Sequence, residues 1–251
     1  MSDDSEAFGQ AVQDVQLSAA CTVAPYGRHC GWKIGATNAG AQAAMGFGPF
    51  YGPLFEGSVH ENGATLSLSN LGATFKASEA EFAFIMGQDL VPSEEAAFTE
   101  EQCYAAVSHV VPAIELAASR LAPHLKPTPA AVLSDCTFNG AVILADTEAR
   151  VARSALRPEA LPTAGAALVL QAETVASSTG ANVLDSPLKA LCWLANALRE
   201  RRQHHLRKGD VIMTGAAAAH KALLPGQTLE AHFTGLTNDA QPLIVRVHIA
   251  A

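Results

Sequence analysis

The chain has 251 residues, enough for one well-buried domain, and 49% of them are hydrophobic while only 16% are charged, a composition that favours a globular fold over disorder. Its formal net charge of -8 argues against a nucleic-acid partner, because phosphate binding requires clustered Lys and Arg. The N-terminus is acidic where a signal peptide would be basic, and no apolar run is long enough to span a bilayer, so we expect a cytoplasmic protein without a membrane partner.

The first 70 residues predict a small N-terminal subdomain that does not fold independently. The Ala- and Gln-rich stretch from Ser5 to Ala24 predicts a helix, and the Gly-rich stretch 27–63, which contains Pro49 and Pro53, predicts loops. Its glycines lack the strand–glycine–helix setting of a dinucleotide-binding motif. Turns and a lid are the expected structures there.

Residues 71–251 predict a β-rich catalytic core. The apolar run Glu79–Met86 predicts a strand, and acidic residues after Thr99 predict a helix from Thr99 to about Val110. Another helix is expected at 186–202, with Ser186 as N-cap and Pro187 at the first position. Further short apolar or strand-like runs occupy 113–117, 131–133, 140–144, 168–174, 211–214, 228–233 and 243–249.

Three glutamates lie inside apolar segments and are candidate metal ligands. Side chains two apart on a strand share a face, so Glu79 and Glu81 should project together, and paired carboxylates call for a proton, a basic partner or a cation. Glu115 is a lone acid in a third such position, and together the three suit a hard ion such as Mg²⁺ or Mn²⁺. The alternatives are two solvated acids at a strand edge, and an ion pair between Glu115 and Arg120.

Lys33 is a candidate catalytic residue, because it lies in Gly31-Trp32-Lys33-Ile34-Gly35, between glycines and bulky apolar residues. A partly desolvated lysine there could face an anion and balance developing enolate charge. The alternative is an ordinary loop lysine with a solvated ammonium group. The sequence contains no G-x-S-x-G, Walker A or H-E-x-x-H motif, so it offers no support for a serine hydrolase, a P-loop nucleotidase or a zinc protease.

These motifs, in this order, resemble the 2-keto-4-pentenoate hydratase and 4-oxalocrotonate decarboxylase group of the fumarylacetoacetate hydrolase superfamily. The similarity spans nearly the whole chain and is carried by Gly31-Trp32-Lys33-Ile34-Gly35-Ala36-Thr37, Tyr51-Gly52-Pro53-Leu54, Glu79-Ala80-Glu81, Pro112-Ala113-Ile114-Glu115, Asp135, Ser186-Pro187, Gly209-Asp210-Val211-Ile212-Met213-Thr214-Gly215 and Pro225-Gly226.

The resemblance implies an α+β fold with a mixed, rolled β core and flanking helices. It also implies Mg²⁺ or Mn²⁺ held by Glu79, Glu81 and Glu115, with Lys33 and Asp135 as catalytic residues. The expected activity is hydration of a 2-hydroxy-2,4-dienoate in aromatic catabolism. We expect a homo-oligomer, with a paralogous enzyme of the same pathway as a further partner.

One position departs from the hydratase pattern. Hydratases of this group usually carry an aspartate just before the aromatic residue of the aromatic-Gly pair, whereas Phe50 precedes Tyr51-Gly52 here. This change removes a candidate proton-transfer group and favours the decarboxylase branch or a more apolar substrate. Decarboxylation of a 2-oxo-3-enedioate, acylpyruvate hydrolysis and a catalytically silent partner subunit therefore remain alternatives.

Overall fold

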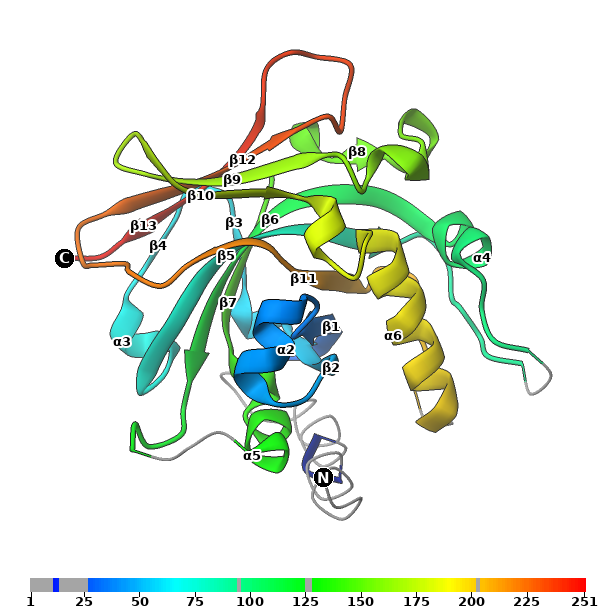
Figure 1. The fold of residues 1–251 in the computed structure, drawn as a ribbon, viewed down its shortest axis with the longest axis horizontal. Coiled ribbons are helices and arrows are strands. Elements are labelled where there is room, and N and C mark those ends of the chain that lie inside the picture. Colours follow the sequence, from blue (N-terminus) through cyan, green and yellow to red (C-terminus); the bar gives the residue numbers. More distant parts are fainter. Residues whose placement is uncertain (1–10, 14–26, 94–95, 125–127, 202–203) are drawn as a thin grey trace.

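The computed structural model describes residues 11–13, 27–93, 96–124, 128–201 and 204–251. Their fold is built on two curled β-sheets with helices at the edges (Figure 1). The larger sheet has eight strands, in the order β2 (Phe50–Phe55), β1 (His29–Gly35), β11 (Val211–His220), β5 (Thr74–Met86), β6 (Val107–Ser119), β7 (Asn139–Leu144) and β3 (Val59–Glu61), with β8 (Val151–Ala152) paired to β6. The smaller sheet has five, in the order β10 (Glu173–Thr179), β9 (Gly165–Leu170), β12 (Thr228–Thr234), β13 (Leu243–Ile249) and β4 (Ala64–Leu66).

Short helices flank the sheets: α2 (Ala39–Met45), α3 (Leu68–Leu71), α4 (Glu100–Ala105), α5 (Pro129–Ser134) and α6 (Pro187–Arg201). Single 3₁₀ turns lie at Glu56–Ser58, Cys136–Phe138, Thr147–Ala149, Arg153–Ala155, Pro158–Ala160 and Gly180–Asn182. Both parallel and antiparallel strand pairs occur, and the predicted α+β fold with a mixed, rolled core is confirmed. No helix among the described residues is both long and apolar enough to cross a membrane.

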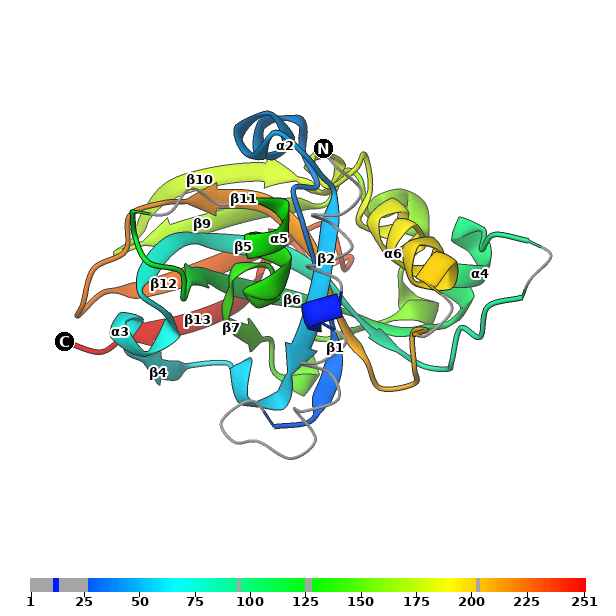
Figure 2. The same ribbon diagram turned by 90° about the horizontal axis from the view of Figure 1, so that it is seen from below.

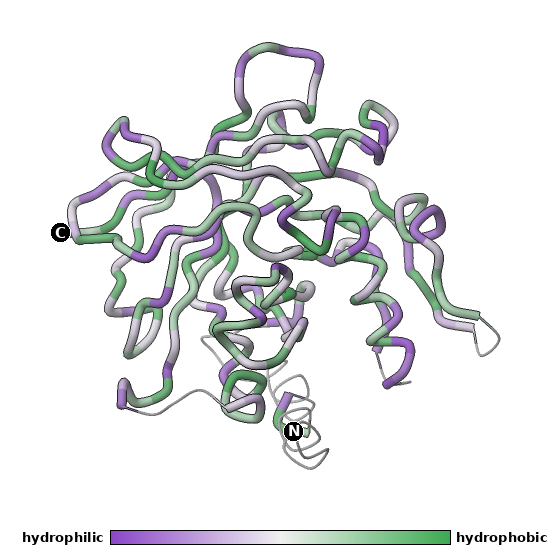
Figure 3. The backbone as a smooth tube through the Cα atoms, in the orientation of Figure 1, coloured by the Kyte–Doolittle hydropathy of each residue, from purple (hydrophilic) through white to green (hydrophobic). Residues whose placement is uncertain are grey.

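The core lies where the two sheets pack against each other. Phe82 of β5 meets Phe233 of β12 edge to face, with ring centroids 5.2 Å apart, and both side chains are fully buried. The strands in this region are coloured mainly as hydrophobic in Figure 3, while the loops at the periphery carry most of the hydrophilic colour. Because strand side chains alternate, Glu79 and Glu81 point to the opposite face of β5 from Phe82.

The Gly-rich stretch 27–63 was expected to be loops, and this prediction is wrong. It forms β1, α2, β2 and β3, and β1 pairs in parallel with β11. A Cβ at Gly31 would lie 1.9 Å from the carbonyl oxygen of Val211. The glycine is there because the two backbones approach closely, which is a reason for glycine within a strand as well as in a loop.

Three other expected elements differ from the structure. The expected helix 99–110 ends at Ala105, where the β-branched residues that follow pair with β5 as part of β6. The expected strand 131–133 is helix α5, whose Thr128 cap and Pro129 at the first position are helix-start signals. The expected strand 168–174 is a hairpin of β9 and β10. The expected helix Ser5–Ala24 lies outside the described residues except for 11–13, which are helical.

The segment before residue 70 shares both sheets with the rest of the chain. Strands β1, β2 and β3 belong to the larger sheet, and β4 pairs with β13 in the smaller one. Figure 2 shows β1 and β2 crossing the open side of the curled larger sheet, close to α2. The division into 1–70 and 71–251 stays a prediction, and the described part of 1–70 supplies one wall of the site.

Candidate active site

Strand register brings the three candidate glutamates to one face of the larger sheet. Glu79 and Glu115 are direct partners in the antiparallel pair β5–β6, and Glu81 is two residues beyond Glu79 on the same face. One carboxylate oxygen from each of the three lies within 4.8 Å of the other two. Glu81 and Glu115 are fully buried, and Glu79 is partly exposed. The alternative of solvated acids at a strand edge does not describe this arrangement.

Lys33 reaches this cluster from β1, which is separated from β6, the strand of Glu115, by β11 and β5. In a flat sheet the backbones of β1 and β6 would lie about 14 Å apart, three strand spacings. The curl of the sheet and the two side-chain lengths close that gap, so that Lys33 Nζ lies 2.8 Å from Glu115 Oε1. Arg120, the alternative partner of Glu115, pairs with Asp135 instead.

A bulge in β11 aims a backbone donor at the cluster. The strand register shifts between Met213 and Ala216, and within this bulge the N–H of Gly215 donates to Glu81 Oε2 at 2.8 Å. Gly215 has a φ of +102°, and a Cβ there would lie 2.1 Å from Thr37 Oγ1. Only glycine therefore fits this donor position without a shift of β11 or Thr37.

The electrostatics of the cluster suit a bound cation. Burial and the charge of Glu115 raise the pKa of Glu79 to about 7, and burial together with Glu115 and Glu79 raises the pKa of Glu81 well above its usual value. Burial alone would lower the pKa of Lys33, but the charges of Glu115 and Glu79 outweigh burial and raise the pKa. Glu81 Oε1 and Glu115 Oε2 accept no hydrogen bond from the described residues. Oxygen atoms that are buried, close together and without donors fit a hard divalent ion.

A left-handed turn beside the cluster holds the ammonium group of Lys33. Lys33 Nζ donates to the carbonyl oxygen of Thr137 at 2.7 Å. Cys136, Thr137 and Phe138 all have positive φ, at 48°, 55° and 64°, which non-glycine residues adopt only when their surroundings enforce it. The backbone carbonyl that positions Lys33 is therefore held in a strained conformation.

Asp135 and Arg120 enforce that turn. The Asp135 carboxylate accepts hydrogen bonds from Ser119 Oγ at 2.9 Å, from the Arg120 N–H at 3.0 Å and from Arg120 Nε at 2.6 Å. Arg120 also donates to the carbonyl oxygens of Asp135, at 2.6 Å, and Asn139, at 2.8 Å, which flank the turn. Asp135 is outside the cluster of glutamates, and both its oxygens are engaged by these donors.

A cavity of about 490 Å³ opens onto the cluster. Lys33, Glu79 and Thr137, which belong to the cluster or hold it, are among the residues that line the cavity. Its walls are mainly apolar, and its charged lining residues are Lys33, Lys76, Glu79 and Lys221. The remaining wall is made chiefly by Ala36, Ala41, Ala44, Met45, Phe50 and Phe138.

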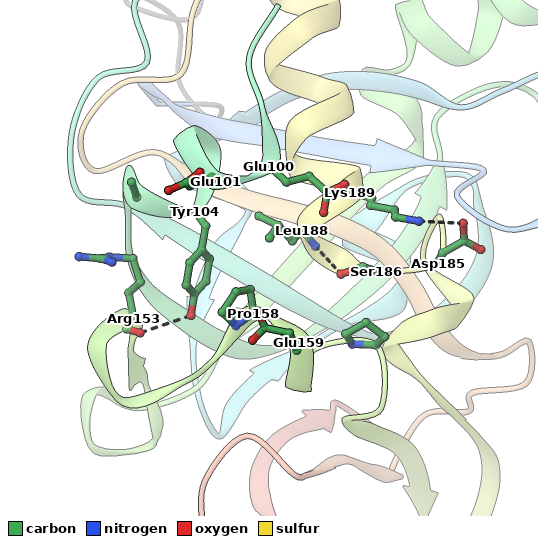
Figure 4. Close-up of a pocket in the computed structure, with 12 residues that line it drawn as sticks. Glu100, Glu101, Tyr104, Arg153, Pro158, Glu159, Asp185, Ser186, Leu188 and Lys189 are labelled. Atoms are coloured by element: carbon green, nitrogen blue, oxygen red, sulfur yellow. Dashed lines mark hydrogen bonds and ion pairs between the residues drawn. The ribbon is translucent and has the colours of Figure 1, made fainter.

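A larger cavity, of about 710 Å³, lies between α4, the start of α6 and the turns after β8 (Figure 4). Several of its polar side chains already have partners: the Tyr104 hydroxyl donates to backbone carbonyls of Arg153 and Leu156, and Lys189 pairs with Asp185. It contains none of the grouped carboxylates that could hold a metal. Volume alone therefore does not make it the candidate site.

Several residues of the site were not anticipated in these roles. Thr137 and Gly215 act through backbone atoms, and Lys76 and Lys221 line the cavity from the ends of β5 and β11. Thr214-Gly215 did appear among the motifs, and a glycine inside a strand-like run is the sequence signal that could have indicated a bulge. Nothing in the local sequence distinguishes Thr137, because its role depends on the left-handed turn.

Known proteins resemble this chain in both sequence and fold. The family model described as "Fumarylacetoacetate (FAA) hydrolase C-terminal" matches residues 57–243. The chain is 32% identical over 213 residues to a 2-keto-4-pentenoate hydratase of Paraburkholderia xenovorans (strain LB400), covering 83% of this chain and 74% of that protein. It is 32% identical over 212 residues to a 4-oxalocrotonate decarboxylase of Pseudomonas putida, covering 82% and 74%.

Among solved structures, the chain is similar to the 4-oxalocrotonate decarboxylase from Pseudomonas putida G7 complexed with magnesium and adipate. The TM-score is 0.76 at 22% identity, covering 99% of this chain and 98% of that one. A second is a fumarylpyruvate hydrolase from Pseudomonas aeruginosa in complex with Mn²⁺ and pyruvate, with a TM-score of 0.62 at 14% identity over 90% of this chain and 91% of that one. At these identities the likeness shows a shared fold.

Proposed function

This chain belongs to the fumarylacetoacetate hydrolase family, and we propose that it is a divalent-metal-dependent lyase that adds water to a 2-hydroxy-2,4-dienoate to give a 4-hydroxy-2-oxo acid. The observation that carries the proposal is the buried cluster of Glu79, Glu81 and Glu115 beside Lys33, in a chain 32% identical to a named hydratase. The proposed setting is the catabolism of aromatic-ring cleavage products.

Glu79, Glu81 and Glu115 are the proposed ligands of the metal, with Mg²⁺ or Mn²⁺ as the ion. When bound, the ion would act as a Lewis acid towards the oxygen atoms at the C1–C2 end of the substrate. The N–H of Gly215 fixes the orientation of the Glu81 carboxylate, which leaves Glu81 Oε1 free of donors from the described residues.

Lys33 is proposed to stabilise negative charge that develops on the substrate. Lys33 is only 4% exposed, and its ammonium group is held by Glu115 and the carbonyl oxygen of Thr137. A preorganised charge of this kind lowers a barrier more than a mobile surface lysine does, because little reorganisation accompanies the reaction. Asp135 is proposed to act through the turn that holds Lys33, as a positioning residue.

The second candidate reaction is decarboxylation of a 2-oxo-3-enedioate, and Phe50 is the observation that favours it. Phe50 lines the cavity at the position where hydratases of this group carry an aspartate. No histidine or aspartate lines the cavity among the described residues. Hydration needs proton transfer at the distal carbons, so an apolar residue there favours a reaction in which carbon dioxide leaves instead.

The two reactions and the metal requirement are tested together. Protein treated with a chelator and then given Mg²⁺ or Mn²⁺ is incubated with 2-hydroxypenta-2,4-dienoate or with 2-oxohex-3-enedioate. Loss of dienoate absorbance without carbon dioxide indicates the hydratase, and release of carbon dioxide indicates the decarboxylase. We expect no turnover before metal is restored. Full activity in metal-free protein would contradict the proposal, and bound metal without turnover of either compound would indicate a silent subunit.

Two variants distinguish positioning by Asp135 from direct proton transfer by it. If Asp135 acts only by stabilising the turn, Asp135→Asn and Arg120→Met should lower kcat by similar factors, about tenfold each. Either substitution removes hydrogen bonds that hold the turn, and the position of the Thr137 carbonyl oxygen that accepts from Lys33 then becomes less well defined. If Asp135 transfers a proton itself, Asp135→Asn should cost about 10²- to 10⁴-fold and Arg120→Met much less. Metal affinity, measured by titration calorimetry, should be unchanged in both variants.

A further inference from the structure

Two cysteines meet where helices α4 and α6 pack against each other. Cys103 lies in α4 and Cys192 lies in α6, and the two helices are side by side (Figure 1, Figure 2). The side chains of Cys103 and Cys192 form a hydrogen bond with each other. Cys103 is fully buried, whereas Cys192 is partly exposed. A buried thiol is therefore in contact with a thiol that solvent can reach.

Hydrogen bonds between α6 and the segment that leads into α4 hold this contact. The Asn196 side chain accepts from the N–H of Phe98 at 2.8 Å and donates to the carbonyl oxygen of Phe98 at 3.1 Å. In its thiol form, Cys192 also donates to that carbonyl oxygen, at 3.3 Å. Thr99 caps α4 with a capping box, and its carbonyl oxygen accepts from the N–H of Cys103 at 3.0 Å. The two sulfur atoms are thus kept together by bonds on both helices.

The hydrogen bond between the sulfur atoms makes the two thiols chemically different. It lowers the pKa of Cys192, and the Asn196 amide, whose Nδ2 lies 3.6 Å from Cys192 Sγ, adds to this effect against burial and the charge of Glu100. The same hydrogen bond, together with burial, raises the pKa of Cys103. Because the thiolate is the reactive form of cysteine, Cys192 is the nucleophile of the pair, and Cys103 is the thiol that stays protonated.

Cys30 and Cys136 are in a different electrostatic setting. Cys30 is partly exposed, as Cys192 is, but burial raises its pKa to about 12, and its thiol donates to the carbonyl oxygen of Leu54 at 3.5 Å. Cys136 is buried, and burial raises its pKa to about 11. Partial exposure alone does not favour a thiolate in this protein, so Cys30 is a control that resembles Cys192 in exposure.

We propose that Cys103 and Cys192 form a reversible oxidation site, at which a hydroperoxide converts the two thiols into a disulfide that cross-links α4 to α6. Sulfur atoms that already form a hydrogen bond need only a short approach to reach the bonded distance of about 2.05 Å. The partial exposure of Cys192 gives the oxidant access, and the bonds of Asn196 to Phe98 keep the second thiol next to it. This site is independent of the reaction that the glutamate cluster catalyses.

The chemistry balances with one hydrogen peroxide for each disulfide. The Cys192 thiolate attacks the peroxide, an S–O bond forms, the O–O bond breaks, and the hydroxide that leaves takes up a proton to become water. Cys192 is then a sulfenic acid. The sulfur of Cys103 attacks the sulfur of Cys192, the S–S bond forms as the S–O bond breaks, and the departing hydroxide takes the Cys103 proton as a second water. A dithiol reductant reverses the cross-link by thiol–disulfide exchange.

The test is treatment of the reduced protein with hydrogen peroxide, followed by alkylation under denaturing conditions, digestion without reductant and mass spectrometry. We expect a disulfide-linked peptide pair that contains Cys103 and Cys192 and that disappears when dithiothreitol is added. Cys192→Ser should abolish this pair and leave Cys103 reduced. Cys103→Ala should leave Cys192 as a sulfenic acid that dimedone traps, because the second thiol is missing. In that variant dimedone should label Cys192 at least about tenfold faster than Cys30.

Thermal unfolding gives a second readout, because a cross-link between residues 103 and 192 closes a loop of about 90 residues in the unfolded chain. We expect oxidation to raise the Tm by at least about 5 °C, and dithiothreitol to reverse the rise. Cys192→Ser should show no rise. Cys30→Ser is the matched control, because it removes a partly exposed thiol outside the pair, and it should form the cross-link and show the full rise.

Three results would overturn the proposal. The first is that Cys103 and Cys192 both remain open to alkylation after peroxide treatment, or that the disulfide joins other cysteines. The second is labelling of Cys30 as fast as Cys192, which would show that exposure alone determines oxidation. The third is a cross-linked protein whose Tm is no higher than that of the reduced protein, which would show that the bond distorts the packing of α4 on α6.

Discussion

We expect Lys33→Met to lower kcat by about 10²-fold or more, the scale of loss when one electrostatic stabiliser is removed from a buried site. Methionine is similar in length to lysine and apolar, so it can fill the space that Lys33 occupies beside Glu115 and Thr137. The charge that offsets an enolate disappears, while strand β1 keeps its packing. Steady-state kinetics with saturating Mg²⁺ gives the measurement, and Lys208→Met is the control for the loss of one positive charge.

The partition between kcat and KM decides what Lys33 does. A loss mainly in kcat means that its ammonium group interacts more strongly with the transition state than with the substrate. A loss that appears mainly in KM would make Lys33 a carboxylate anchor that binds ground state and transition state alike. Kinetics equal to those of the unchanged protein would remove Lys33 from the mechanism.

The second large effect is expected from Glu81→Gln, which should weaken Mg²⁺ binding at least about 100-fold. Replacing residues that only orient metal ligands typically costs about 10- to 100-fold, and loss of a ligand charge should exceed that range. The amide oxygen of the introduced glutamine can still accept the hydrogen bond from Gly215, so the fold should persist. Titration calorimetry with Mg²⁺ provides the affinity, and Glu61→Gln, at the exposed end of β3, is the matched control.

Thermal unfolding gives an independent readout of the same variant. Burial and the neighbouring carboxylates raise the pKa of Glu81, which means that its charged form is disfavoured in the metal-free protein. Glu81→Gln should therefore raise the Tm without metal, and reduce the further rise that saturating Mg²⁺ produces. An unchanged metal affinity would show that Glu81 is merely a buried strand residue.

Local sequence was sufficient to single out the acids that the structure brings together. Three acids within apolar runs led to Glu79, Glu81 and Glu115 as candidate metal ligands, because isolated buried charges need compensation, and their carboxylates do lie within 4.8 Å of one another. The helix 186–202 and the strand 243–249 were also expected closely, since caps and apolar periodicity are local properties. Where glycine or a short apolar run allowed more than one structure, as in 27–63 and 131–133, local sequence was misleading.

The sequence by itself therefore determined which groups are available to a site: three carboxylates and a lysine between glycines. It also determined that position 50 carries an apolar side chain. The tertiary structure decided how they meet. The register of β5 on β6 places Glu79 opposite Glu115, and the curl of the sheet brings Lys33 across two strands. It also decided that Asp135 braces a turn and that Lys76 faces the cavity. Register, curl and bulges depend on backbone pairing between segments distant in the chain, so no local pattern could supply them.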